Sequence, residues 1–422
     1  MNKRFASGFG VIIFLNISAM AAFAGDWPQW RGADRTGVSK ETGLLKKWPA
    51  DGPKRIWMYE NAGYGYSGPS IVNGKFFVIG TRDNSECVLA LDANTGKELW
   101  VAKIGDMWQN DRGGGPRGNP TVSGDKVYAL SGKGDLACVN IADGKVAWTA
   151  SMREMGGKVP GWGYSESVLV DGDKVLCTPG GSKGALAALD KNTGKEVWRS
   201  TDFTDSAHYS SIIAPEVHGA KQYIQITMQN VVGVSPKDGK VLWKTDFPGR
   251  TAVIPTPIYR DSQVYVTAGY GAGCKSVKIA ANNEVTTVYE NKVMKNHHGG
   301  VILVGDHLYG YSDGSGWICQ DFKTGDEVWA EKTKLGKGAI AYADGMLYCL
   351  DEGKSTLVLI EASPKGWNEQ GRFTLEPQSK LRSRDGKIWT HPVISNGKLY
   401  LRDQDLIYCY DVKGGQALTL NR

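Results

Sequence analysis

The chain has 422 residues, and its 50 Lys and Arg against 44 Asp and Glu give a net charge of +6 at pH 7. No long basic run accompanies this small excess, so the sequence has no nucleic-acid-binding footprint. Glycine is frequent, with 55 residues, and long helical patterns are absent, which together favour an all-β fold with many turns.

The N-terminus carries the pattern of a secretory signal peptide over residues 1–24. Lys3 and Arg4 precede an apolar run over residues 11–23, and the segment ends in Ala22-Phe23-Ala24. The run is too short to span a membrane, and no Cys follows a small-residue box, so a lipid anchor is not expected. The sequence therefore predicts an exported protein, periplasmic or secreted.

Residues 25–54 form a lead-in segment that contains Asp26-Trp27-Pro28-Gln29-Trp30-Arg31-Gly32. We expect Trp27, Trp30 and Trp48 to pack this segment onto the following domain. An exposed aromatic docking patch is the alternative interpretation.

The stretch over residues 66–104 has the sequence pattern of four short antiparallel strands joined by turns. Asn73-Gly74 and Gly96 mark tight turns, because Asn and Gly tolerate a positive φ. The predicted strands cover residues 70–72, 75–80, 87–92 and 98–104, with a polar loop over 81–86. Four such strands make one propeller blade.

The phrase A-x-D-x-x-T-G-K-x-x-W, which ends this stretch at Trp100, recurs at intervals typical of propeller repeats. The phrase ends at Trp100, Trp148, Trp198, Trp243 and Trp329, with a degenerate copy near Tyr289. The aromatic position of the fourth strand is filled eight times, by Trp57, Trp100, Trp148, Trp198, Trp243, Tyr289, Trp329 and Phe373. These eight positions predict an all-β, eight-bladed β-propeller of four-stranded antiparallel blades over residues 55–422. The sequence after Phe373 supplies three strands without a fourth, and the N-terminus has an orphan strand at 55–59, so we expect the two to pair and close the ring.

The eight aromatic residues are interpreted as wedges between blades, not as ligand platforms. Burying one removes about 150–250 Å² of surface from water, which corresponds to roughly 4–6 kcal/mol as an upper bound. The repeat alignment also interprets most of the seven Cys as small buried hydrophobic residues. Cys87 and Cys274, expected in loops or at strand starts, are the one plausible redox pair.

A functional site is expected on the face of the ring that carries the longer loops, around the mouth of the central channel. The residues expected to line it are Tyr66, Arg82, Arg117, Tyr164, His208, Tyr209, His297, His298, Lys337, Trp389 and His391. Cationic and aromatic groups together suit an anionic or quinone-like planar ligand. Metal binding by the His residues, or a cation shared by Asp313 and Glu352, is a weaker hypothesis. The sequence assigns no catalytic residue.

These repeats resemble the PQQ-like β-propeller repeat, which occurs in quinoprotein alcohol dehydrogenases and in the outer-membrane assembly lipoprotein BamB. The resemblance extends from Trp57 to Val412. It departs from the dehydrogenases in having no adjacent Cys pair and no calcium-ligand set that can be mapped, and from BamB in having no lipobox Cys.

The resemblance therefore implies a BamB-like, non-catalytic binding or scaffold protein of the cell envelope, expected to be a monomer. Its partner at the channel mouth would be an envelope protein or a small-molecule, glycan or peptide ligand. The alternative is a dehydrogenase that uses PQQ and calcium to oxidise an alcohol or a sugar.

Overall fold

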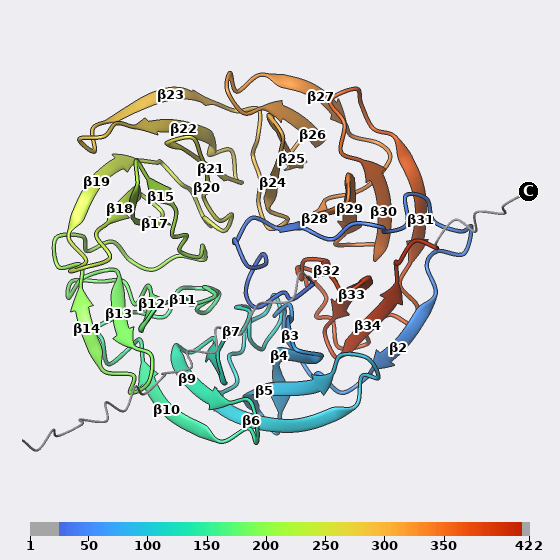
Figure 1. The fold of residues 1–422 in the computed structure, drawn as a ribbon, viewed down its shortest axis with the longest axis horizontal. Helices are drawn as coiled ribbons and strands as arrows, with labels where there is room; N and C mark the ends of the chain where they lie inside the picture. The colour runs from blue at the N-terminus through green and yellow to red at the C-terminus, as the bar shows by residue number, and fades with distance from the viewer. Residues whose placement is uncertain (1–24, 416–422) are drawn as a thin grey trace, which may run out of the picture.

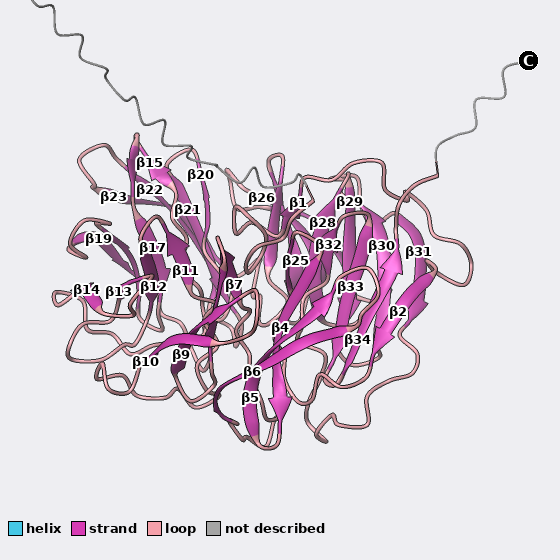
Figure 2. Cartoon of the chain, turned by 60° about the horizontal axis from the view of Figure 1, so that its bottom comes forward, coloured by secondary structure: helices cyan, strands magenta, loops and turns pink. Residues whose placement is uncertain are grey.

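The computed structural model describes residues 25–415, so the predicted signal peptide over 1–24 lies outside the described residues. The described chain consists of 34 strands joined by turns and loops, arranged as a ring whose middle is called the channel here (Figure 1). Figure 2 shows the same ring obliquely, with the loops gathered at the two ends of the strands. Between residues 25 and 415, no helix is long and apolar enough to cross a membrane.

Eight sheets radiate from the channel, and they are called blades 1 to 8 here in chain order. Within a blade, consecutive strands pair antiparallel from the channel outwards, and the short β1 (Val38–Ser39) of the lead-in joins blade 7 in parallel beside its innermost strand. Blade 1 has β3 (Ser70–Val72), β4 (Lys75–Arg82), β5 (Ser85–Asp92) and β6 (Glu98–Asp106); blade 2 has β7 (Thr121–Ser123), β8 (Lys126–Leu130), β9 (Asp135–Asn140) and β10 (Val146–Ser151). Blade 3 has β11 (Leu169–Asp171), β12 (Lys174–Cys177), β13 (Ala187–Asp190) and β14 (Glu196–Arg199).

The other half of the ring follows the same order. Blade 4 has β17 (Tyr223–Ile226), β18 (Asn230–Val234) and β19 (Val241–Asp246); blade 5 has β20 (Ile258–Arg260), β21 (Gln263–Ala268), β22 (Gly273–Ile279) and β23 (Val285–Asn291). Blade 6 has β24 (Val301–Val304), β25 (His307–Ser312), β26 (Gly316–Asp321) and β27 (Glu327–Glu331). Blade 7 has β28 (Gly338–Ala343), β29 (Met346–Asp351), β30 (Thr356–Glu361) and β31 (Glu369–Thr374).

Blade 8 joins the two ends of the described chain. It has β32 (Val393–Ser395), β33 (Lys398–Asp403) and β34 (Leu406–Asp411), and its outermost strand is β2 (Arg55–Tyr59) from the N-terminal region. Trp57 pairs with Cys409 across this antiparallel junction, where blue β2 lies beside red β34 in Figure 1. The eight-bladed fold and its closure by the N-terminal strand are therefore confirmed.

Blade 4 departs from the predicted four strands. Its innermost strand is reduced to a single bridge between Ile213 and Ile224. Pro215 follows at once, and a proline cannot donate to a sheet ladder. The chain instead forms a short hairpin of β15 (Glu216–Val217) and β16 (Ala220–Lys221) before it enters β17.

The turns of blade 1 explain its strand lengths. Val72 pairs with Lys75, so Asn73-Gly74 is the predicted two-residue turn, with φ of 50° and 73°. The polar loop predicted over residues 81–86 is wrong, because Arg82 pairs with Ser85. Asp83 and Asn84 form another two-residue turn with φ of 45° and 58°, a conformation that short polar side chains tolerate. Strands β4 and β5 are consequently longer than predicted.

The repeated Trp and the repeated Gly of the sequence phrase contact each other between blades. The aromatic residue on the outermost strand of one blade packs on the turn glycine of the next blade. A methyl group added to such a glycine would lie between 2.4 and 2.9 Å from the ring. The pairs are Trp57 with Gly96, Trp100 with Gly144, Trp148 with Gly194, Trp198 with Gly239, and Tyr289 with Gly325.

The wedges also make hydrogen bonds. The indole N–H of Trp148 donates to Lys191 O at 3.0 Å, and Trp329 donates to Ser363 O at 2.9 Å. Trp243 differs, because it donates to the Gln222 side chain of its own blade at 2.6 Å. Each bond gives the packed indole N–H a hydrogen-bond acceptor, which it would otherwise lack.

Phe373 of blade 7 packs on Gly52, which lies just before β2 at the other end of the chain. Gly52 thus takes the place of the turn glycine in blade 8, the blade whose strands come from both ends. Ring closure therefore reproduces the wedge contact as well as the strand pairing.

The seven cysteines are free and buried. Cys87 is the third residue of β5 in blade 1 and Cys274 the second residue of β22 in blade 5, so both lie at strand starts, one of the two placements expected, and neither lies in a loop. Their side chains face blade cores for the same reason as the other five: alternate positions of a strand point inwards. The structure has no disulfide between them.

The lead-in segment runs through the middle of the ring, where its blue trace is visible in Figure 1. It contacts every blade. The contacts, each given as the lead-in residue and then its partner in a blade, are Trp27 with Ile71, Pro28 with Val122, Trp30 with Thr256, Arg31 with Val301, Arg35 with Ser167, Val168 and Ile212, Val38 with Tyr342, and Glu41 with Asn396. The segment acts as a hub, because backbone groups at the inner ends of the blades find hydrogen-bond partners on it.

Arg35 makes the densest of these hub contacts. Its guanidinium donates to Ile212 O at 2.7 Å, Ser167 O at 2.9 Å and Val168 O at 2.6 Å. Burial lowers its pKa to about 10, so it remains charged at neutral pH. One side chain thereby joins blades 3 and 4 to the hub.

Candidate functional site

A cavity of about 360 Å³ lies at the mouth of the channel and is called the mouth pocket here. Its volume falls in the range of small-molecule sites. Eight of the eleven side chains expected at the mouth line it: Tyr66, Arg117, Tyr209, His297, His298, Lys337, Trp389 and His391. They come from loops that lead into the innermost strands of six blades, so the ring brings together residues that are far apart in sequence.

The other three expected residues lie elsewhere. Arg82 points to the outer strand, where it bonds Tyr59 and Glu98. Tyr164 is buried in the core between blades 2 and 3, and its hydroxyl donates to Pro179 O at 3.0 Å. The His208 ring accepts a hydrogen bond from Val253 N at 2.9 Å and packs on Tyr209, behind the lining.

The lining also contains residues that the sequence reasoning did not assign to the mouth. Trp30 and Arg31 come from the hub, Arg112, Trp162 and Lys387 come from long loops, and Tyr270 comes from the short loop between β21 and β22. The aromatic and Arg-rich start of the lead-in was a signal for the first two. A second cavity, of about 530 Å³, lies along another part of the hub, around Asp34 and Arg35.

Aromatic rings form a continuous wall of the mouth pocket. Tyr270 contacts His297 at 4.4 Å between ring centroids, and His297 stacks on His298 at 3.6 Å. His298 stacks on Trp389 at 4.8 Å, and Trp389 packs on Tyr66 at 4.8 Å. This wall spans the loops of blades 5, 6, 8 and 1.

The histidines of this wall are neutral at pH 7. Burial lowers the pKa of His297 to about 2 and that of His298 to about 3. The pKa of His391 falls to about 3, because of burial and the nearby Arg31 guanidinium. The imidazoles therefore act as flat polar rings and not as cations.

An ammonium group pairs with Asp313, one of the two carboxylates hypothesised to share a cation. Lys337 Nζ is 2.7 Å from Asp313 Oδ1 and 2.8 Å from His297 Nδ1. Within residues 25–415, no group of three His, Cys, Asp or Glu side chains is placed to hold a metal ion. Asp313 thus already has its counter-charge.

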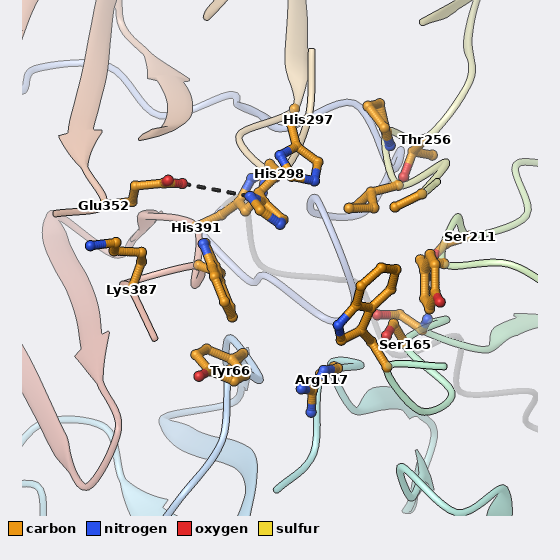
Figure 3. A pocket seen from close by; sticks show the side chains of 18 of the residues that line it. Tyr66, Arg117, Ser165, Ser211, Thr256, His297, His298, Glu352, Lys387 and His391 are labelled. Atoms are coloured by element: carbon orange, nitrogen blue, oxygen red, sulfur yellow. Dashed lines mark hydrogen bonds and ion pairs between the residues drawn. The ribbon is translucent and has the colours of Figure 1, made fainter. Parts of the chain in front are cut away.

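Three polar atoms beside the wall have no hydrogen-bond partner among the described residues: His298 Nδ1, Glu352 Oε2 and Trp389 Nε1. Glu352 Oε2 is 3.6 Å from His298 Nδ1, the contact dashed in Figure 3. Burial raises the pKa of Glu352 to about 7. Buried polar groups normally have partners, so these atoms mark where a ligand or solvent would bind.

Cationic side chains lie at the same pocket. The Arg117 guanidinium packs over the Tyr66 ring at 5.2 Å and donates to Gly113 O and Gly115 O. The side chains of Arg112 and Lys387 form no hydrogen bond or ion pair with any part of the chain that the structure describes. Figure 3 shows Glu352 and Lys387 on one side of the pocket, with Ser165, Ser211 and Thr256 opposite.

The two parts of a PQQ–calcium cofactor fit this lining unequally. Aromatic faces and free cations suit a planar organic acid. Calcium requires six to eight oxygen ligands, usually with several carboxylates, whereas the lining carboxylates are Glu352 and Asp385, which form no group of three with other His, Cys, Asp or Glu side chains of the described chain. The chain's residues therefore do not fit the calcium part of that cofactor.

The fold and the site define a class of protein: an eight-bladed propeller of PQQ-like repeats with a pocket at its channel mouth. A family model described as "Outer membrane protein assembly factor BamB" matches residues 83–331, more than half of the chain. The chain therefore belongs to this family.

A curated relative is the outer membrane protein assembly factor BamB of Yersinia pestis, 24% identical over 76% of this chain and 68% of that protein. The BamB structure from Moraxella catarrhalis superposes with a TM-score of 0.60 at 13% identity, over 86% of this chain and 98% of that one. The structure of the quinohemoprotein alcohol dehydrogenase from Comamonas testosteroni superposes with a TM-score of 0.63 at 13% identity, over 94% of this chain and 82% of that one. At such identities the two structures show the shared fold alone. The BamB relatives fit a location in the cell envelope.

Proposed function

We propose that this protein is an exported, non-catalytic propeller that binds partners during outer membrane protein assembly. The observation that carries the proposal is the family match over residues 83–331, which runs from the second half of blade 1 to the end of blade 6. The signal-peptide pattern over residues 1–24 supports a periplasmic or secreted location. An envelope protein docked on the ring would be the partner, with the protein itself a monomer.

Deletion of the gene in its own organism tests this role. We expect the abundance of outer membrane proteins to fall relative to inner membrane proteins in quantitative proteomics of envelope fractions. A plasmid copy of the full chain should restore it, and a copy that starts at residue 25 should not, because it would not be exported. Unchanged outer membrane protein levels in the deletion strain would refute the proposal.

The location has its own test. Fractionation with mass spectrometry should find the mature protein outside the cytoplasm with Gly25 as its first residue. Intact residues 1–24 on the protein, or recovery with the cytoplasmic fraction, would contradict export.

A second function is favoured by the aromatic and cationic lining: a dehydrogenase that holds PQQ in the mouth pocket. Incubation with PQQ and calcium, followed by dye reduction over a panel of alcohols and sugars, tests it. Turnover that disappears in Arg117→Ala would replace the scaffold proposal. No turnover above the level without PQQ would remove this alternative.

A further inference from the structure

We infer that the mouth pocket binds an acidic sugar, that is, a pyranose ring that carries a carboxylate or a phosphate. The inference deepens the proposed function, because it names a small ligand for the same channel mouth. It depends on three features of the lining: aromatic rings, unpartnered groups suited to hydroxyls, and cations without an ion-pair partner.

The aromatic residues provide faces for the apolar side of a sugar ring. Tyr66 and Trp389 pack together on one wall at 4.8 Å, and Trp162 and Tyr209 form another pair with their centroids 5.8 Å apart. All four line the pocket. The C–H groups on one face of a pyranose pack on such rings, as apolar ligand surface does in most small-molecule sites.

The unpartnered polar atoms suit a hydroxyl group better than an anion. Trp389 Nε1 can only donate a hydrogen bond, whereas an ionised Glu352 can only accept one. A hydroxyl does both, so it can satisfy the indole and the carboxylate. An ionised planar polyacid without hydroxyls offers acceptors alone, so it cannot donate a hydrogen bond to Glu352. The hydroxyls of Ser165 and Ser211 lie across the pocket from Glu352 and extend the same polar pattern (Figure 3).

The cations select for an acidic ligand. Arg112 and Lys387 form no ion pair with a described residue, and Arg117 donates to two backbone carbonyls. Lys387 nevertheless lies near enough to Glu352 to oppose the rise that burial causes in the pKa of that carboxyl. Lys337 is paired with Asp313, so it adds little attraction. The unpaired charges around the sugar position are therefore mainly positive, and a carboxylate or phosphate would form charge-assisted hydrogen bonds with them.

The test uses the purified mature protein and isothermal titration calorimetry, checked by saturation-transfer NMR. The probes are glucuronate, glucose 6-phosphate, glucose and benzene-1,3,5-tricarboxylate, the last as a planar polyacid. We expect at least one of the two acidic sugars to bind about tenfold tighter than glucose and than the planar acid, the gain expected for one charge-assisted hydrogen bond.

Two variants locate the contacts. Lys387 is exposed, so Lys387→Gln should fold normally and weaken the acidic sugar about tenfold while leaving glucose unchanged. Trp389→Phe keeps an aromatic face but removes the N–H, and should weaken the acidic sugar and glucose alike, by about fivefold. Lys240→Gln is the matched control, because Lys240 lies on an outer turn of blade 4 beyond the pocket lining.

Equal affinity for glucuronate, glucose 6-phosphate and glucose would overturn the inference, as would no saturable binding of either acidic sugar. Tighter binding of benzene-1,3,5-tricarboxylate would also overturn it, in favour of a planar ligand. An effect of Lys240→Gln equal to that of Lys387→Gln would show that general surface charge is responsible. The assay contains no envelope partner, so its failure leaves the assembly proposal intact, and failure of the deletion experiment leaves this binding result intact.

Discussion

The contact between the repeated Trp and the repeated Gly gives the sharpest prediction about this fold, and Gly239 tests it. Gly239 has a φ of 72°, and a methyl group added there would lie 2.4 Å from Trp198 Cε3. An L-residue in this conformation costs about 1–2 kcal/mol. Overpacking a tight contact adds about 1–3 kcal/mol. We expect Gly239→Ala to lower the free energy of unfolding by about 2–5 kcal/mol.

Gly172 provides the matched control. It sits in a turn of blade 3 with a φ of 59°, and a methyl group added there meets no heavy atom within 4 Å. Gly172→Ala therefore has the conformational cost without the steric one, about 1–2 kcal/mol. The difference between the two variants isolates the contact with the Trp198 ring.

Urea unfolding followed by tryptophan fluorescence and circular dichroism measures both variants. In a Trp198→Ala background the ring is gone, so Gly239→Ala should cost no more than Gly172→Ala does. The double-mutant cycle should thus give a coupling energy of about 1–3 kcal/mol. If Gly239→Ala and Gly172→Ala are equally destabilising in the wild-type background, the interpretation that the Trp198 ring packs on Gly239 as a wedge is refuted.

Three further predictions concern the wedge, the hub and the pH dependence of stability. Trp100→Ala should cost about 3–5 kcal/mol in urea unfolding, and a loss below about 1 kcal/mol would contradict its role as a wedge. Arg35→Leu should cost about 3 kcal/mol or more because three buried carbonyls lose their donor, and limited proteolysis should then cleave within residues 25–40; a protected segment would contradict the hub. The pKa of His391 is depressed to about 3 in the folded protein, so its contribution to stability is present above pH 6.5 and is lost as the unfolded chain takes up a proton below it. Between pH 7.5 and pH 5, the free energy of unfolding of His391→Gln should therefore fall by about 2 kcal/mol less than that of the wild type. An identical pH dependence in both proteins would contradict a buried neutral imidazole.

The fold could be predicted from the sequence because its signals are local and repeated. A turn at Asn73-Gly74 depends on two residues that tolerate a positive φ, and Trp100 ends a phrase that also contains the turn glycine. Repetition of these signals around the chain fixed the blade count. Even ring closure could be inferred, since an orphan strand at 55–59 matched a blade with one strand missing.

The candidate site could be predicted only in part. Tyr66, His297 and Trp389 were found from their position before an innermost strand, a rule that follows from blade geometry. The same rule failed for Tyr164, because the rule gives the end of the blade at which a residue lies but not the direction of its side chain.

The sequence by itself determined the repeat, the number of blades and the wedges, because each depends on contacts within one blade or between neighbouring ones. Only the tertiary structure decided that the lead-in passes through the channel and that Trp30 and Arg31 face the mouth pocket. It also decided that Lys337 neutralises Asp313 while Arg112 and Lys387 stay unpaired. These features depend on distances between side chains of different blades and the lead-in, which are 24 positions apart for Lys337 and Asp313 and 270 for Arg31 and Val301, and no local pattern encodes such distances.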